Sequence, residues 1–222
     1  MLHIWNAGVF TPAEFFNEFF LMTIGIVTAF FMNLYMPGKI GLIRSYQSHI
    51  EEGMRAILMQ LAQALIHRRE DPAVEEQFLR LEHLLKDALE SALYTEKNYV
   101  FRDMSYYASY IRMRIRQFEL LKRIRDNSPR LRGLYYQTLL TARFMEQIAF
   151  SLQEHNNSKE LLARLAELRR IFRQAPLPVT RQEFEARAVL YEIVGELEAL
   201  LRLKREFAEN LTDYQIRTFW KI

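Results

Sequence analysis

Residues 15–36 read FFNEFFLMTIGIVTAFFMNLYM, and this stretch decides the fold of the 222-residue chain. From Phe19 to Met36 there is no charged side chain, and Asn33 is the only strongly polar residue. A helix rises 1.5 Å per residue, so the stretch reaches about 33 Å, which matches the hydrocarbon core of a bilayer. No basic segment precedes it and no small-residue cleavage site follows it, so a signal peptide is a poor fit. We therefore predict a transmembrane helix over residues 15–36.

The distribution of charge predicts how this helix is oriented. Residues 1–38 contain Glu14 and Glu18 but no Lys or Arg, so they carry a charge of −2. The whole chain carries +3, so the remaining 184 residues carry +5, and the first bases after the helix are Lys39 and Arg44. Basic residues flank the cytoplasmic end of a membrane span. We expect a protein of the cell membrane with residues 39–222 in the cytoplasm.

One face of the predicted span differs from the rest. At 100° per residue, an arc of about 80° contains Glu18, Met22, Gly25, Ala29 and Asn33. Gly25 and Ala29 form a small-xxx-small pair that lets another helix approach closely, and Asn33 can hydrogen-bond across such a contact. We predict packing against other transmembrane helices, from a second copy in a homo-oligomer or from a portion of protein before Met1. The alternative is a lone anchor in the lipid bilayer whose small residues are incidental.

After Gly38 the apolar residues recur at the 3–4 spacing of helices throughout. Caps and breakers divide this pattern into helices from Ile43 to about Arg68, Pro72 (capped by Asp71) to about Asn98, Asp103 to about Asn127, Ser128-Pro129 to about Glu154, Ser158 to Gln174, and Thr180 past Leu211. The prediction is an all-α chain: one transmembrane helix in domain 1–38, then an antiparallel bundle of about six helices in domain 39–222. In the tail, Phe219, Trp220 and Lys221 are expected to pack on the bundle rather than on the bilayer.

The sequence lacks the common signatures of catalysis. It contains no cysteine, which excludes disulfides and thiolate chemistry. None of its five histidines follows an acid by three residues, as helical di-iron sites require, and it has no P-loop spacing and no Gly-x-Ser-x-Gly elbow. We predict no catalytic residue, no metal site and no cofactor, and we do not expect an enzyme.

Residues 106–125, YYASYIRMRIRQFELLKRIR, combine aromatic and basic side chains as nucleic-acid-binding segments do. A helical wheel separates the two kinds, because Arg112, Arg116 and Arg123 fall on one solvated face. No nucleic-acid partner is therefore expected. On the opposite, apolar face lie the candidate site residues Tyr106, Tyr107, Tyr110, Arg114 and Gln117.

Two interpretations of this cluster stay open. In the first, Arg114 is a buried structural cation paired with a carboxylate on a neighbouring helix, for example Glu90 or Glu146, since an unpaired buried charge costs several kcal/mol. In the second, Tyr106 or Tyr110 flanks a pocket for a small ring, and Arg114 binds its carboxylate in bidentate fashion. The ligand would then be a small aromatic carboxylate.

Several short motifs carry a resemblance to a known family. They are Asn17-Glu18, Ile24-Gly25-Ile26 and Asn33-Leu34-Tyr35-Met36-Pro37 in the span, and Tyr106-Tyr107…Tyr110…Met113-Arg114…Gln117…Leu120-Leu121 in the soluble part. From about Glu14 to Glu206 the chain resembles the last transmembrane helix and the cytoplasmic C-terminal domain of the aromatic acid exporter family. These are bacterial membrane proteins related to fusaric-acid-resistance-type transporters.

The resemblance implies a transport-related function. Members of the family carry about six spans and this sequence has one, so it looks like a fragment, or a split or mispredicted start, that keeps the final span. The soluble domain would then have a regulatory, assembly or gating role in an exporter. The alternative is a single-span membrane anchor whose helical domain is a scaffold for protein partners.

Overall fold

The structure is a computed structural model that describes residues 12–34, 37–67, 72–98 and 105–220. All regular structure in these residues is helical, which confirms the predicted all-α class. The chain divides into two compact units, Met1–Leu42 and Ile43–Ile222, and each is described by itself.

The first unit contains α1 (Pro12–Leu34), which begins three residues before the predicted start. Side chains 12–30 are all exposed. Within it, the hydroxyls of Thr23 and Thr28 donate to the carbonyls one turn earlier at 2.7 Å, so neither is left unpaired in an apolar environment. Pro12–Phe30, with mean hydropathy 1.3, is the one helix in the described residues that is long and apolar enough to cross a membrane.

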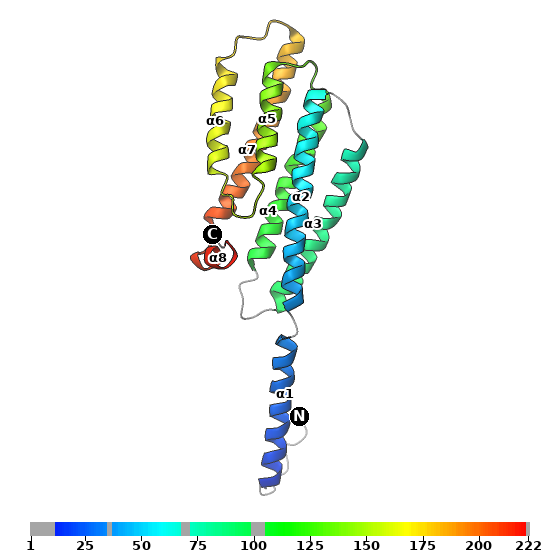
Figure 1. Cartoon of the computed structure of the whole chain (residues 1–222), viewed down its shortest axis with the longest axis vertical. Coiled ribbons are helices and arrows are strands. Elements are labelled where there is room, and N and C mark those ends of the chain that lie inside the picture. The colour runs from blue at the N-terminus through cyan, green and yellow to red at the C-terminus, as the bar shows by residue number, and fades with distance from the viewer. Residues whose placement is uncertain (1–11, 35–36, 68–71, 99–104, 221–222) are drawn as a thin grey trace. The chain divides into compact units, whose positions relative to one another are not determined.

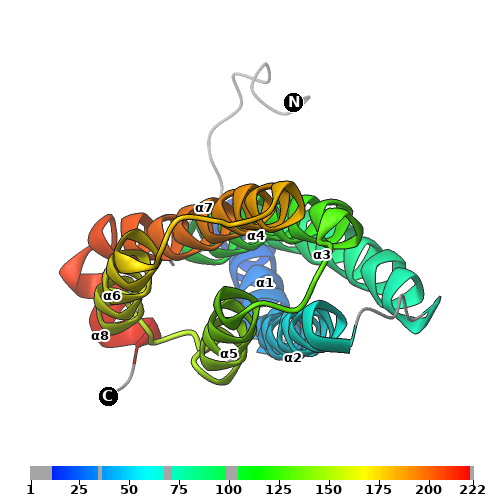
Figure 2. The ribbon, with the colours of Figure 1, turned by 90° about the horizontal axis from the view of Figure 1, so that it is seen from above.

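The bundle is built from six long helices: α2 (Pro37–His67), α3 (Pro72–Asn98), α4 (Ser105–Asn127), α5 (Tyr136–Phe150), α6 (Lys159–Gln174) and α7 (Arg181–Glu209). Successive helices run in opposite directions, as predicted (Figure 1). Seen from above, α3, α4 and α7 form one row, and α2, α5 and α6 form the second (Figure 2). A short helix, α8 (Asp213–Phe219), follows α7.

The predicted apolar stripes form the core between the two rows. In α2 the six stripe residues are all at most 2% exposed: Ile43, Ile50, Met54, Ile57, Leu61 and Leu65. α4 is central, because it packs against α3 on one side and α7 on the other. This position explains why most of the length of α4 is buried, including polar side chains that would otherwise face water.

Three predicted boundaries are corrected. Ser128–Arg130 forms only a 3₁₀ turn (η1), and α5 begins at Tyr136, because Gly133 adopts a φ of 95° that no right-handed helix can contain. α5 ends at Phe150, not near Glu154. α7 ends at Glu209, and the chain restarts as α8 rather than continuing past Leu211.

The helix caps follow the sequence in one case and depart from it in another. Thr180 accepts a hydrogen bond from the Glu183 N–H at 3.1 Å, as predicted for an N-cap. Ser158 occupies the N-cap position of α6 with a φ of 59°, but its side chain makes no capping bond. The predicted cap at Asp71 and the predicted helix start at Asp103 lie outside the described residues.

Candidate functional site

The five residues singled out on residues 106–125 all lie inside the bundle. Tyr106, Tyr107, Tyr110, Arg114 and Gln117 are each at most 1% exposed. They are brought together because they lie on one face of α4, and this face points toward α2, α7 and the connection between α5 and α6.

Arg114 is the centre of the cluster, and each of its three guanidinium nitrogens has a partner. Nε donates to the Tyr110 hydroxyl at 2.9 Å, one terminal nitrogen donates to Gln117 Oε1 at 3.0 Å, and the other donates to Glu51 Oε1 at 2.8 Å. The Tyr110 hydroxyl donates to the same Glu51 oxygen. The carboxylate partner is therefore Glu51 on α2, rather than Glu90 or Glu146, because α2 packs beside this part of α4.

The partners of Arg114 keep it charged in spite of its burial. Burial acts to lower the pKa of Arg114, but the neighbouring Tyr110 and Glu51 together raise it above its ordinary value. Burial raises the pKa of Tyr110, and Glu51 raises it further. The Tyr110 hydroxyl therefore keeps its proton and can donate a hydrogen bond. The result is a matched ion pair with its hydrogen bonds in place, which is the condition under which buried charges are tolerated.

Gln117 and Tyr106 extend the network to other helices. The Gln117 amide donates to the Leu200 carbonyl of α7 at 2.8 Å. The Tyr106 hydroxyl donates to Glu154 Oε1 at 2.6 Å and accepts from the Trp220 indole at 3.1 Å. These bonds join α4 to α7, to Glu154 in the connection after α5, and to Trp220 at the end of α8.

The tail packs on this cluster rather than staying free. The Phe219 ring stacks on Tyr106 with centroids 4.3 Å apart and planes at 6°, and it meets Tyr107 edge-on at 5.2 Å. Trp220 is 9% exposed. Phe219 and Trp220 thus pack on the bundle as expected, while Lys221 lies outside the described residues.

Lys204 interrupts the apolar stripe of α7 and is a further functional candidate. It is 4% exposed, and its Nζ donates to the Glu154 backbone carbonyl at 2.6 Å. Burial lowers its pKa to about 7, with Arg114 the next contributor, while Glu51 and Glu154 act in the opposite direction. The signal in the sequence is a lysine at a position of α7 where the apolar pattern predicts a core residue.

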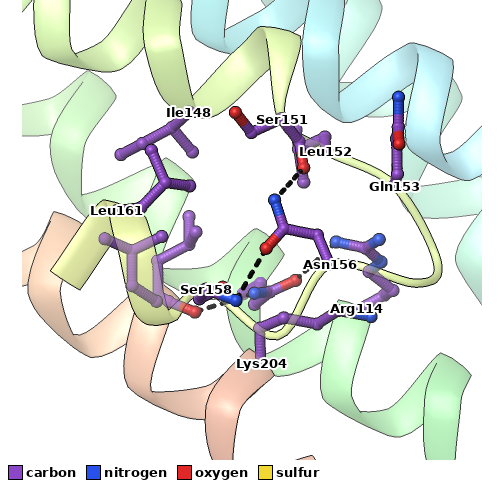
Figure 3. Close-up of a pocket in the computed structure, with 12 residues that line it drawn as sticks. Arg114, Ile148, Ser151, Leu152, Gln153, Asn156, Ser158, Leu161 and Lys204 are labelled. Carbon is purple, nitrogen blue, oxygen red and sulfur yellow. Dashed lines mark hydrogen bonds between the residues drawn. The ribbon is translucent and has the colours of Figure 1, made fainter. Parts of the chain in front are cut away.

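Two hollows adjoin the cluster, and they differ in what they can hold. A cavity of about 10 Å³ lies between Arg114, Lys204 and the connection after α5, with Asn156 on its wall (Figure 3). This is the space of about one water molecule, so the guanidinium does not open onto a site large enough for an aromatic ring. A groove of about 310 Å³ lies outside it, lined by Arg44, Gln47, Ser48, Glu51, Tyr107, Glu154, His155, Thr218 and Phe219.

The other sequence-predicted residues are placed as follows. Gly25 lies on α1, where an added Cβ would meet no atom within 4 Å, and Ala29 is exposed on the same helix. The side chain of Asn33 lies outside the described residues. Among the described residues, no three His, Asp or Glu side chains are placed to hold a metal ion.

An apolar helix long enough to cross a membrane, followed by a helical bundle, defines the class: an all-helical protein with one candidate membrane span among its described residues. Residues 1–36 match the family model "Aromatic acid exporter family member 1", and residues 41–205 match "Putative aromatic acid exporter C-terminal domain". The chain belongs to the aromatic acid exporter family, a family of exporters rather than of enzymes.

Two individual proteins are similar to this chain. An uncharacterized Bacillus subtilis (strain 168) protein, YqjA, is 31% identical over 207 residues, which are 93% of this chain and 64% of that protein. The chain thus spans less than two thirds of the length of this curated relative. A crystal structure described as a putative membrane protein from Clostridium difficile 630 has the same fold, with a TM-score of 0.69 and 20% identity, and covers 77% of this chain and 99% of that one.

Proposed function

We propose that this chain supplies the last transmembrane helix and the cytoplasmic C-terminal domain of a membrane exporter for small aromatic acids. In this proposal the domain assembles or gates the transport path and does not bind the substrate itself. The family match over both parts of the chain supports the exporter assignment.

The proposed role of the domain rests on the ion pair and hydrogen bonds that hold α2 to the rest of the bundle. Only two residues separate the end of α1 from the start of α2, so α2 is the covalent continuation of the span. Glu51 pairs with Arg114 of α4 at 2.8 Å, and Arg55 donates to the carbonyls of Ala149 and Leu152, at the end of α5, at 3.2 Å each. These bonds make the position of α2 depend on two other helices, which suits a domain that senses or fixes the position of the span.

The satisfied state of Arg114 supports a structural rather than a substrate-binding domain. A substrate carboxylate would have to displace Glu51 to reach the guanidinium. The full chain in detergent should therefore show no change in thermal stability with a panel of aromatic carboxylates. A ligand at a hundred times its dissociation constant would add about 2.7 kcal/mol, so a shift of that size would contradict this part of the proposal.

Orientation and helix packing complete the proposal. Glu14 and Glu18 lie at the N-terminal end of the span and Lys39 follows it, which favours a cytoplasmic bundle. A reporter fused after Ile222 should then be active only when it is of a kind that works in the cytoplasm. The face of Gly25 and Ala29 would pack against further spans of the same exporter or against a second copy.

The exporter function is tested by retention of a labelled aromatic carboxylate, such as benzoate, in cells with and without the gene. We expect lower retention with the wild-type protein and loss of this effect in Glu51→Gln, at an unchanged amount of protein in the membrane. Glu76→Gln is the matched control, because Glu76 forms an exposed pair with Arg80 on α3.

The two possible failures have different meanings. Equal retention in cells with and without the wild-type gene would refute the exporter and favour the membrane-anchored scaffold. Normal export by Glu51→Gln would instead refute only the dependence of export on the ion pair that holds α2 to α4.

A further inference from the structure

The last helix of the chain forms a strap over the aromatic cluster. We call residues 213–220, which are α8 and Trp220, the C-terminal latch. A capping box between Thr212 and Gln215 starts its helix, and three residues link it to α7. The family match ends at residue 205, so the latch lies beyond the matched domain.

The latch is held by aromatic contacts at its end. Phe219 stacks on Tyr106, and the Trp220 indole donates to the Tyr106 hydroxyl at 3.1 Å. Trp220 also forms one wall around the amine of Lys204, whose Nζ lies 5.4 Å from the centre of that ring. The other walls are the Tyr110 ring at 5.4 Å and the Phe207 ring at 5.3 Å.

This enclosure gives a charged amine few partners. An ammonium has three donors, and the bond to the Glu154 carbonyl uses one of them. Three ring faces attract a cation only weakly compared with water, and the adjoining cavity holds about one water molecule. The neutral amine needs no such compensation, so closing the latch favours the uncharged form of Lys204.

The charged and titratable groups around Lys204 do not supply the partners that a charged amine would need. α2 contributes Glu51 and α4 contributes Arg114, and these two are bonded to each other; the connection after α5 contributes Glu154. The Glu154 side chain accepts from the neutral Tyr106 and from Gln47, and among the described residues Lys204 forms no salt bridge. The further titratable groups nearby are Tyr110 on α4 and His155, whose ring lies 6.2 Å from that of Trp220.

We infer that the C-terminal latch is a proton-sensitive strap, closed over Lys204 when the amine is neutral and released when the amine takes up a proton. With the latch open, water reaches the amine and its ordinary affinity for protons returns. The direction agrees with a pKa that burial lowers from 10.5 to about 7 in the closed form. If the open form recovers the ordinary value fully, the open-to-closed ratio falls about 50-fold between pH 7 and pH 9.

Hydrogen exchange of the full chain in detergent micelles tests this inference, since exchange detects an open form that is rarely populated. The measurement is the protection of the backbone amides of the latch at several pH values, corrected for the intrinsic exchange rate. We expect protection in the wild-type protein to rise up to about 50-fold from pH 7 to pH 9. Lys204→Met should show high protection that does not change with pH.

Two control variants assign the titrating group. Lys159→Met removes an exposed lysine at the start of α6, and His155→Gln removes the histidine beside Trp220; both should keep the wild-type pH response. Protection that is independent of pH in the wild-type protein would overturn the inference. So would a pH response that persists in Lys204→Met or disappears in His155→Gln. The wild-type measurement decides by itself if a variant fails to fold.

Discussion

Replacing Glu51 with leucine should destabilise the bundle more than replacing its partner Arg114 with leucine. The two side chains make the same 2.8 Å ion pair, but their surroundings differ: the Arg114 side chain is 1% exposed and the Glu51 side chain is 17% exposed. When Glu51 is removed, a fully buried guanidinium loses its counter-charge. When Arg114 is removed, the remaining carboxylate lies at the groove and can be reached by water.

These surroundings set the expected magnitudes. Breaking a buried pair from the side that leaves a buried charge costs about 3–5 kcal/mol, so we expect about 4 kcal/mol for Glu51→Leu. Arg114→Leu leaves the Gln117 side-chain oxygen without its donor, and a buried unpaired acceptor costs about 1–3 kcal/mol. With the lost packing of the arginine stem, we expect about 3 kcal/mol. The double variant should cost less than Glu51→Leu alone, because it leaves no buried charge.

The assay is urea unfolding of the full chain in a mild detergent, followed by the helical circular dichroism signal. The four proteins of the double-mutant cycle give the coupling energy directly. If the two single variants lose the same free energy of unfolding, Glu51 behaves as a fully buried group like Arg114, and the reasoning from their different exposure is refuted. Penalties that simply add in the double variant would refute the ion pair as the reason for the stability loss.

Three further perturbations have defined outcomes. Because the pKa of Lys204 is about 7 in the folded protein and 10.5 unfolded, the unfolded chain binds more protons between these values. The free energy of unfolding should therefore rise with pH across this window, by at most about 5 kcal/mol, and Lys204→Met should flatten the curve in urea titrations. Gly133→Ala should lower the free energy of unfolding by about 1–3 kcal/mol, seen as a lower melting temperature, because φ is 95° and the new Cβ would collide with the Tyr135 ring. Gly25→Leu should leave bundle unfolding unchanged but reduce cross-linking between transmembrane helices, since the pair Gly25–Ala29 lets helices approach.

The helical fold was predictable because its signals are local. The stripe of α2 starts at Ile43, repeats every three or four residues from Ile50 to Leu65, and all its members are buried. Pro72 marks the start of α3 because proline fits the first turn of a helix. The start of α5 was not predictable in this way, because the residues after Pro129 are also apolar at helical spacing. The backbone at Gly133 ends that pattern, and a glycine alone does not reveal its φ.

The candidate site was predictable on one helix only. Arg114 and Gln117 were recognisable as polar residues in the apolar face of α4, and both are fully buried. Their partner Glu51 was not, because a carboxylate at the edge of a stripe resembles any solvated acid until the packing of α2 against α4 is known. Lys204 was visible as an anomaly, but the rings that enclose it come from α4, α7 and the latch, which only the fold brings together.

The anchors of α2 have a mechanical consequence. Gln47, Glu51 and Arg55 are spaced four residues apart, so they lie one above another along the helix. Glu51 bonds to α4, and Gln47 and Arg55 bond to the end of α5 and the connection after it. A force that pulls α2 along its own axis would stretch all three bonds at once instead of breaking them in turn. The displacement would then reach α4 and the end of α5 together.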